Sequence, residues 1–293
     1  MDPLPNVIRL RIRNRRRAGS ATYHRGMRMP PDLQRLPGVA GTAAVRWGSD
    51  WWRVFHFGAQ LLALAFSPST YAPRHRPALA RHVYLDTAPN LLWFTVLSAL
   101  ISLVLIRIVI VTAASYGLGQ YALEMVIRVL VLELIPLTAA LFVALRCTVP
   151  SGAELSRMHA RGDLLRLQAR GIDPVRHELM PRVVAGIFAV GLLAALSCLI
   201  ALFIAYLSLY GLSLGAFAGF TRIVGQIFEP GVMMILALKT LLFSLAVSLI
   251  PVGALLRGPR PDTTRTSAAL DSLVRMFLAI LLIEVASLIG NYT

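Results

Sequence analysis

The stretch VVAGIFAVGLLAALSCLIALFIAYLSLY, residues 183–210, carries no charged side chain and decides the fold class. A helix needs about 20 predominantly apolar residues to cross the hydrocarbon core of a bilayer, so this stretch predicts a membrane-spanning helix. Of the 293 residues in the chain, 57% are hydrophobic and 15% are charged. A soluble domain normally carries about a quarter charged residues. The sequence therefore predicts an all-α membrane protein and argues against a soluble one.

Four further apolar segments on either side of this stretch are also long enough to cross a bilayer. They are Leu91–Ala114, Tyr121–Cys147, Gly231–Leu256 and Ala268–Gly290. With residues 183–210 they give five predicted membrane-spanning helices. The second and third helices are joined by a long polar loop, Thr148–Arg182.

The distribution of arginine predicts how the chain is oriented. Arginines gather near the N-terminus, in Thr148–Arg182 and in the loop after the fourth helix. The loops Ser115–Gln120 and Gly211–Pro230 contain only Arg222 between them. Because basic residues favour the cytoplasmic side, we expect the N-terminus in the cytoplasm and the C-terminus outside. The protein is thus expected to be a multi-pass membrane protein.

The region before the first crossing has two parts. Residues 1–45 form a basic extension, which we expect to be disordered and to face cytoplasmic lipid. A nucleic-acid partner is not expected, because the extension lacks a folded nucleic-acid-binding motif and interleaved aromatic residues. Residues 46–90 begin with Trp47, Trp51 and Trp52, which suit the headgroup zone, and they predict an amphipathic helix lying in the membrane interface. Residues 91–293 form the predicted transmembrane domain.

The loop Thr148–Arg182 is patterned like short helices and not like a linker. Its apolar face has helical spacing and consists of Leu155, Met158, Gly162 and Leu165. Asp163 is placed to cap a second helix, and Gly171 is placed to end it. Asp173 and Pro174 then predict a helix restart. The pattern leaves two interpretations open, a docking element for a soluble partner and an amphipathic helix resting on anionic lipid.

Ionisable side chains within the predicted crossings need a partner, a cavity or a headgroup, because each costs about 2.5–3.5 kcal/mol at the bilayer centre. Those singled out are Arg107, Glu124, Arg128, Glu133, Arg146, Lys239 and Glu284. Glu124 and Arg128 are four residues apart and are expected to pair along one helix face. Arg146 is expected to reach towards phosphates or to pair with Glu154. For Lys239 and Glu284 we expect buried pairing between helices.

Among these residues, Glu133 has the position that most clearly suggests a function. It lies three residues before Pro136, which frees a backbone carbonyl and allows a kink. Two hypotheses stay open. Glu133 either faces a lipid cavity, where it gates or orients a headgroup, or it pairs with a neighbouring helix through Lys239 or Arg107.

Several kinds of catalytic chemistry have no motif in this sequence. Lys239 is the sole lysine and has no glycine-rich phosphate loop before it, so the chain has no nucleotide site of its own. The histidines show no metal-ligand spacing, and no nucleophile elbow occurs. Cys147 and Cys198 lie in apolar runs and are expected to be small buried apolar residues.

A series of short motifs runs in register from the second crossing into the third. The motifs are Glu133-Leu134-Ile135-Pro136, Ala139-Ala140-Leu141, Arg146, Ala153-Glu154-Leu155, Met158, Gly171-Ile172-Asp173-Pro174, Pro181-Arg182 and Ala185-Gly186. In this order they resemble the MlaE/YrbE permease family, over about residues 82 to 190. The sequence differs from the family pattern at Leu132 and Ile135, where the family has arginine and glycine.

The resemblance implies a permease subunit of an ABC transporter that moves phospholipid or a related lipid between the inner and outer membranes and so maintains outer-membrane lipid asymmetry. It implies a homodimer in the bacterial inner membrane, with the C-terminus of each copy in the periplasm. It also implies partner ABC ATPase subunits that bind ATP and magnesium, and a periplasmic MCE-domain protein. No cofactor is expected in this chain.

The resemblance also implies roles for particular residues. Glu133, Pro136 and Arg146 would line or gate the lipid cavity. The loop Thr148–Arg182 would contain the coupling helix that docks on the ATPase. Its expected contacts are Glu154, Arg157, Met158, Arg161, Asp163, Leu165, Gln168, Asp173 and Pro174.

Two other functions compete with a transporter. One is a membrane scaffold that anchors an MCE-domain protein without transport. The other is an integral-membrane enzyme acting on lipids, which would need a cluster of interfacial His, Asp or Glu residues that the sequence does not offer. Co-purification of an ATPase through residues 154–177 would distinguish a transporter from a scaffold.

Overall fold

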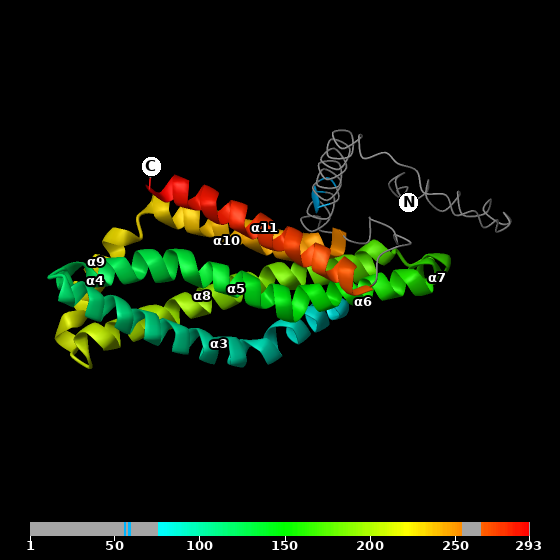
Figure 1. Ribbon diagram of the computed structural model, residues 1–293. Coiled ribbons are helices and arrows are strands. Elements are labelled where there is room, and N and C mark those ends of the chain that lie inside the picture. Colours follow the sequence, from blue (N-terminus) through cyan, green and yellow to red (C-terminus); the bar gives the residue numbers. More distant parts are fainter. Residues whose placement is uncertain (1–55, 57, 60–75, 254–264, 293) are drawn as a thin grey trace, which may run out of the picture. The chain divides into compact units, whose positions relative to one another are not determined.

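The computed structural model describes residues 56, 58, 59, 76–253 and 265–292 (Figure 1). The chain divides into two compact units, Met1–Arg46 and Trp47–Thr293, and all the described residues belong to the second. The predicted basic extension therefore lies outside the described residues. So do most of the predicted interfacial helix and the loop after the fourth crossing.

Within these ranges every regular element is helical, and five helical segments are long and apolar enough to cross a membrane. They are Thr87–Ser115, Gly119–Arg161, Val175–Tyr210, Pro230–Gly253 and Leu270–Gly290. The five predicted crossings and the all-α fold class are thus confirmed. We refer to these segments as spans 1 to 5.

Some spans consist of one helix, and others consist of several consecutive helical elements. Span 1 lies in α3 (Arg76–Ser115), span 3 in η6 (Val175–Leu179) and α8 (Met180–Tyr210), span 4 in α10 (Pro230–Gly253), and span 5 in α11 (Arg265–Tyr292). Span 2 joins η3 (Gly119–Tyr121), α4 (Ala122–Val126), η4 (Ile127–Leu134), α5 (Ile135–Val143), η5 (Ala144–Thr148) and α6 (Val149–Arg161). Span 2 therefore continues well past Cys147, where the sequence predicted its end. The helix α3 likewise begins at Arg76, so residues 76–90 are continuous with span 1.

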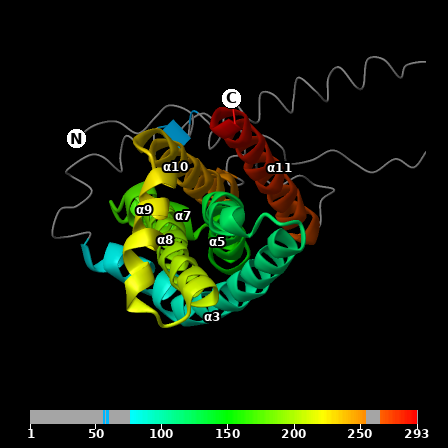
Figure 2. The same cartoon turned by 90° about the vertical axis from the view of Figure 1, so that its left-hand side faces the viewer.

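The central helix of the packing is α8, which contacts α3, α5 and α10, while α11 packs mainly on α10 (Figures 1 and 2). Small residues allow this close packing of the helices. Ala185 and Ala189 are fully buried. A Cβ added at Gly186 would lie 2.5 Å from the Ser248 hydroxyl oxygen on α10.

The apolar core falls into clusters at different levels of the spans. One cluster joins α5, α8, α10 and α11 around Phe243 and Leu193. A second joins span 2 and α8 around Ile127 and Ala201, and Phe220 and Ile227 of α9 (Phe217–Ile227) close it. The short η7 (Leu214–Ala216) leads into α9. In Figure 1, α9 lies at the opposite end of the spans from α6 and α7 (Asp163–Ala169).

Three of the helical segments are π-helical: η4, η5 and η6. A π-helical turn holds one extra residue, which shifts the direction of the side chains that follow, and such turns occur often at functional sites. Each of the three contains at least one charged residue: Arg128 and Glu133 in η4, Arg146 in η5, and Arg176 and Glu178 in η6. The sequence predicted a kink at Pro136, and the structure has the π-helical η4 directly before it.

The predicted short helices of the loop are present, with one difference. The helix α6 ends at Gly162, which has a left-handed φ of +77°, and α7 follows. Gly171 has a φ of +75°, and the Asp173 carboxylate accepts a hydrogen bond from the Val175 N–H at 3.0 Å before η6, as predicted. Asp163 does not cap α7 but is its first residue, because Gly162 already occupies the capping position.

Candidate functional site

A buried group of three charges joins spans 2, 4 and 5. Lys239 on α10 has a side chain that is only 1% exposed, and its ammonium group forms ion pairs with Glu133 on η4 and Glu284 on α11. The Lys239–Glu284 distance is 2.9 Å. Of the two hypotheses for Glu133, the structure has the interhelical pair with Lys239. We call Glu133, Lys239 and Glu284 the charge triad.

A backbone group completes the surroundings of Lys239. Pro136 has no N–H and cannot bond to the Leu132 carbonyl four residues earlier, as a residue in an α-helix would. The Lys239 ammonium group donates to that carbonyl oxygen at 3.4 Å. The Leu132 carbonyl is thus a third ligand of the buried cation, beside the carboxylates of Glu133 and Glu284.

The other intramembrane charges have different surroundings. The Arg128 guanidinium pairs with the Glu124 carboxylate at 2.9 Å, and both side chains are about two-fifths exposed, as the spacing of four predicted. Arg107 lies exposed on α3, and it has no ion-pair partner among the residues that the structure describes. The proposed pairing of Glu133 with Arg107 is therefore wrong.

A second buried charge connects the loop helices to span 3. Arg182, with a side chain 6% exposed, pairs with Glu178 at 3.0 Å and with Glu154 of α6 at 3.5 Å. It also donates to the Ser151 carbonyl oxygen at 3.3 Å. We call this set the Arg182 clamp. The sequence offered only a weak signal for it, an arginine directly after Pro181 at the start of an apolar run.

The residues expected to contact an ATPase fall into two groups. Their neighbour Leu155, which was not one of the expected contacts, is fully buried against Leu179, Met180 and Val183 and holds α6 in place. Met158 is partly buried beside Arg182. The remaining expected contacts lie at or near the surface: Glu154, Arg157, Arg161 and Leu165 are exposed, and Asp163, Gln168, Asp173 and Pro174 are half-buried.

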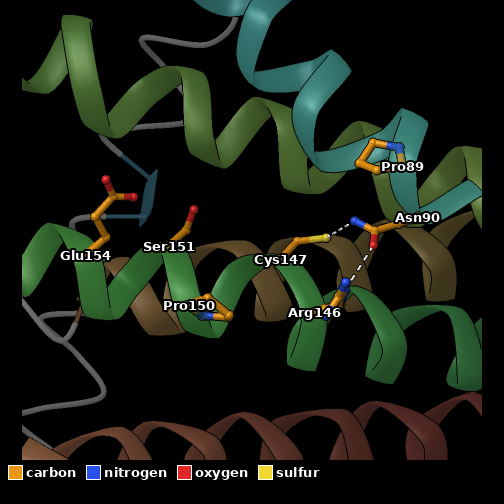
Figure 3. Close-up of a pocket in the computed structure, with 7 residues that line it drawn as sticks. All are labelled: Pro89, Asn90, Arg146, Cys147, Pro150, Ser151 and Glu154. Carbon is orange, nitrogen blue, oxygen red and sulfur yellow. Dashed lines mark hydrogen bonds between the residues drawn. The ribbon is translucent and has the colours of Figure 1, made fainter.

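A polar pocket of about 340 Å³ lies between the start of span 1 and the segment from η5 into α6 (Figure 3). Its lining residues are Pro89, Asn90, Arg146, Cys147, Pro150, Ser151 and Glu154. The expected pairing of Arg146 with Glu154 is wrong. The Arg146 Nε donates to the Asn90 side-chain oxygen at 3.3 Å, and Glu154 pairs with Arg182.

The cysteines and acidic residues of the described ranges do not gather into a site for a metal ion. Cys147 is buried and accepts a hydrogen bond from the Asn90 amide at 3.2 Å. Cys198 is partly buried, with its thiol 3.7 Å from the Val131 carbonyl oxygen. Both cysteines therefore lie among packed helices, as apolar residues do.

Comparison with known families identifies the chain. The family described as Permease MlaE matches residues 79–289, which is more than two thirds of the sequence and runs from α3 into α11. A comparison with curated proteins gives no match.

Proposed function

We propose that this chain, which belongs to the MlaE permease family, is the membrane subunit of an ABC transporter that moves phospholipid or a related lipid between the inner and outer membranes of a bacterium. The observation that carries the proposal is the rigid connection between the loop helices and the spans. The helix α6 is the last part of the unbroken span 2, and the Arg182 clamp fixes α6 to the start of span 3.

The proposed orientation places α6 and α7 in the cytoplasm, in accordance with the arginine-rich loop that contains them. Arg157, Arg161 and Leu165 are exposed there and offer a mixed basic and apolar surface to a soluble ATPase. That ATPase would bind ATP and magnesium, since this chain has no phosphate-binding loop. A second copy of the chain and a periplasmic MCE-domain protein would complete the transporter.

In the proposed mechanism, the ATPase subunits close on ATP and displace α6 and α7. Because α6 is continuous with span 2, the displacement reaches η4 and the charge triad, which ties span 2 to spans 4 and 5. Two arrangements of the spans would then differ in how they open a lipid cavity, and ATP would shift the population between them. Glu133 and Pro136 would act by coupling this movement to the cavity.

Co-purification tests this proposal against the scaffold alternative. Leu165 is half-exposed on α7, so Leu165→Arg should remove apolar contact with the ATPase and abolish its recovery with the tagged chain. Leu212→Arg is the matched control, because Leu212 is 90% exposed at the other end of the spans. An ATPase recovered equally with both variants would contradict docking through α7. A wild-type chain that brings down no ATPase would favour the scaffold.

A further inference from the structure

The pocket between span 1 and α6 has a chemistry that the proposed mechanism does not use. Figure 3 shows Asn90 of α3 lying between Arg146 and Cys147 of η5, with Ser151 and Glu154 further along α6. The pocket begins where span 2 is still apolar and ends where α6 has become polar. This is the level of the chain at which a membrane helix meets lipid headgroups.

Arg146 is a positioned cation whose charge no described side chain neutralises. Its Nε is held by the Asn90 oxygen at 3.3 Å, and the Asn90 amide nitrogen donates to the Cys147 sulfur at 3.2 Å, which fixes the orientation of the amide. The two terminal amino groups of Arg146 have no hydrogen-bond partner among the described residues. A guanidinium of this kind suits a phosphate, which it can bind through two parallel hydrogen bonds.

Glu154 is a carboxylate that is only partly neutralised. Among the residues that the structure describes, its one cationic partner is Arg182, which is 3.5 Å away and lies closer to Glu178, at 3.0 Å. Two carboxylates thus share one guanidinium, and the Glu154 side chain is 62% exposed. It retains the capacity to attract a second cation.

Arg146 and Glu154 line the same pocket without pairing with each other. Eight residues of helix separate them, which corresponds to about 12 Å along the axis. A ligand that bridges them needs an anionic group for Arg146 and a cationic group for Glu154 in the same molecule. A phosphoethanolamine headgroup has this arrangement, with the Ser151 side chain lining the pocket between the two charges.

We infer that this pocket binds the zwitterionic headgroup of a phosphatidylethanolamine-type phospholipid, with the phosphate on Arg146 and the ammonium on Glu154. The inference deepens the proposed function by naming a lipid class, and it rests on that function for placing α6 at a membrane surface. It does not require an ATPase or transport, so lipid binding by the chain alone can be tested separately.

The test measures lipids retained by the full-length protein after exchange into nanodiscs of equal phosphatidylethanolamine and phosphatidylglycerol with the same acyl chains. Native mass spectrometry reports the ratio of retained phosphatidylethanolamine to retained phosphatidylglycerol. We expect wild type to retain several times more phosphatidylethanolamine. Glu154→Gln should bring the ratio close to one by lowering phosphatidylethanolamine alone. Arg146→Gln should reduce retention of both lipids by roughly tenfold, because both carry the phosphate.

A control variant and a competition experiment show whether the retained lipid is bound in this pocket. Arg128→Gln is the matched control, since Arg128 lies on the same span near its other end and pairs with Glu124, and it should leave retention and the ratio unchanged. Soluble glycerophosphoethanolamine should compete with the lipid, whereas inorganic phosphate should compete much less. Equal retention of the two lipids by wild type would overturn the inference. So would an unchanged ratio in Glu154→Gln, or competition by inorganic phosphate as strong as that by glycerophosphoethanolamine.

Discussion

Lys239 on α10 donates a hydrogen bond to the carbonyl oxygen of Leu132 on span 2, at 3.4 Å. In a regular α-helix the N–H of residue 136 would bond to this oxygen, but residue 136 is proline. The same ammonium group pairs with Glu133 and Glu284. The sole lysine of the chain thus links the irregular part of span 2 to two other spans, and it is the natural target for the first test.

Replacement of Lys239 by methionine should strongly destabilise the fold. It leaves two carboxylates in low-dielectric surroundings without their cation, and breaking a buried pair in this way typically costs about 3–5 kcal/mol. The measurement is the unfolding midpoint of the full-length protein in detergent. The combined variant Lys239→Met, Glu133→Gln, Glu284→Gln removes all three charges and should recover most of the loss. A single variant as stable as wild type would show that the triad contributes nothing to folding.

Replacement of Gly152 by alanine should disturb the packing of α6 on α10. The added Cβ would lie 2.8 Å from the Pro251 Cβ and 3.0 Å from its carbonyl oxygen, and backbone atoms cannot easily move away. Overpacking of this kind costs about 1–3 kcal/mol. Gly191→Ala is the control, because its Cβ would meet nothing within 4 Å, and it should be neutral or slightly stabilising. Unfolding midpoints compare the two, and equal midpoints would contradict the close approach.

Replacement of Arg182 by glutamine should uncouple the loop helices from the spans. It removes the guanidinium that joins Glu154 and Glu178, while the buried Leu155 still anchors α6. We therefore expect the proposed ATPase to bind and hydrolyse ATP, with lipid transport reduced by tenfold or more. The control is Arg176→Gln, whose partly exposed pair with Asp173 spans 3.7 Å and should contribute under about 1 kcal/mol. Full transport by Arg182→Gln would remove the clamp from the mechanism.

The number and placement of the spans could be predicted from the sequence, because crossing a membrane depends on the length and apolar character of one continuous segment. Gly171 and Asp173 were also predictable, since helix ends depend on local backbone chemistry. The partner of Glu133 was not. From the sequence, Lys239 and Arg107 were equally good candidate partners for Glu133. The packing of α10 on span 2 places Lys239 beside Glu133.

Two features could not have been read from local patterns. In the Arg182 clamp, Glu178 and Arg182 have the spacing of four that favours pairing along a helix, but the contact of Arg182 with Glu154, 28 residues earlier, cannot be read from spacing. The π-helical segments η4, η5 and η6 are the second feature, because the apolar pattern of a crossing does not distinguish a π-helical turn from an α-helical one. The pairing of Arg146 with Glu154 failed for a related reason, because the buried Arg182 competes for the same carboxylate.

The measurement that tests the central claim most directly is ATP-dependent lipid transfer by the reconstituted complex. Vesicles containing the chain and its ATPase would be loaded with labelled phospholipid, and transfer to the periplasmic partner would be followed with ATP or with a non-hydrolysable analogue. We predict transfer that requires hydrolysis, is lost in Leu165→Arg and is retained in Leu212→Arg. Transfer at the same rate without hydrolysis, or at the wild-type rate in Leu165→Arg, would contradict the account of an externally driven lipid permease.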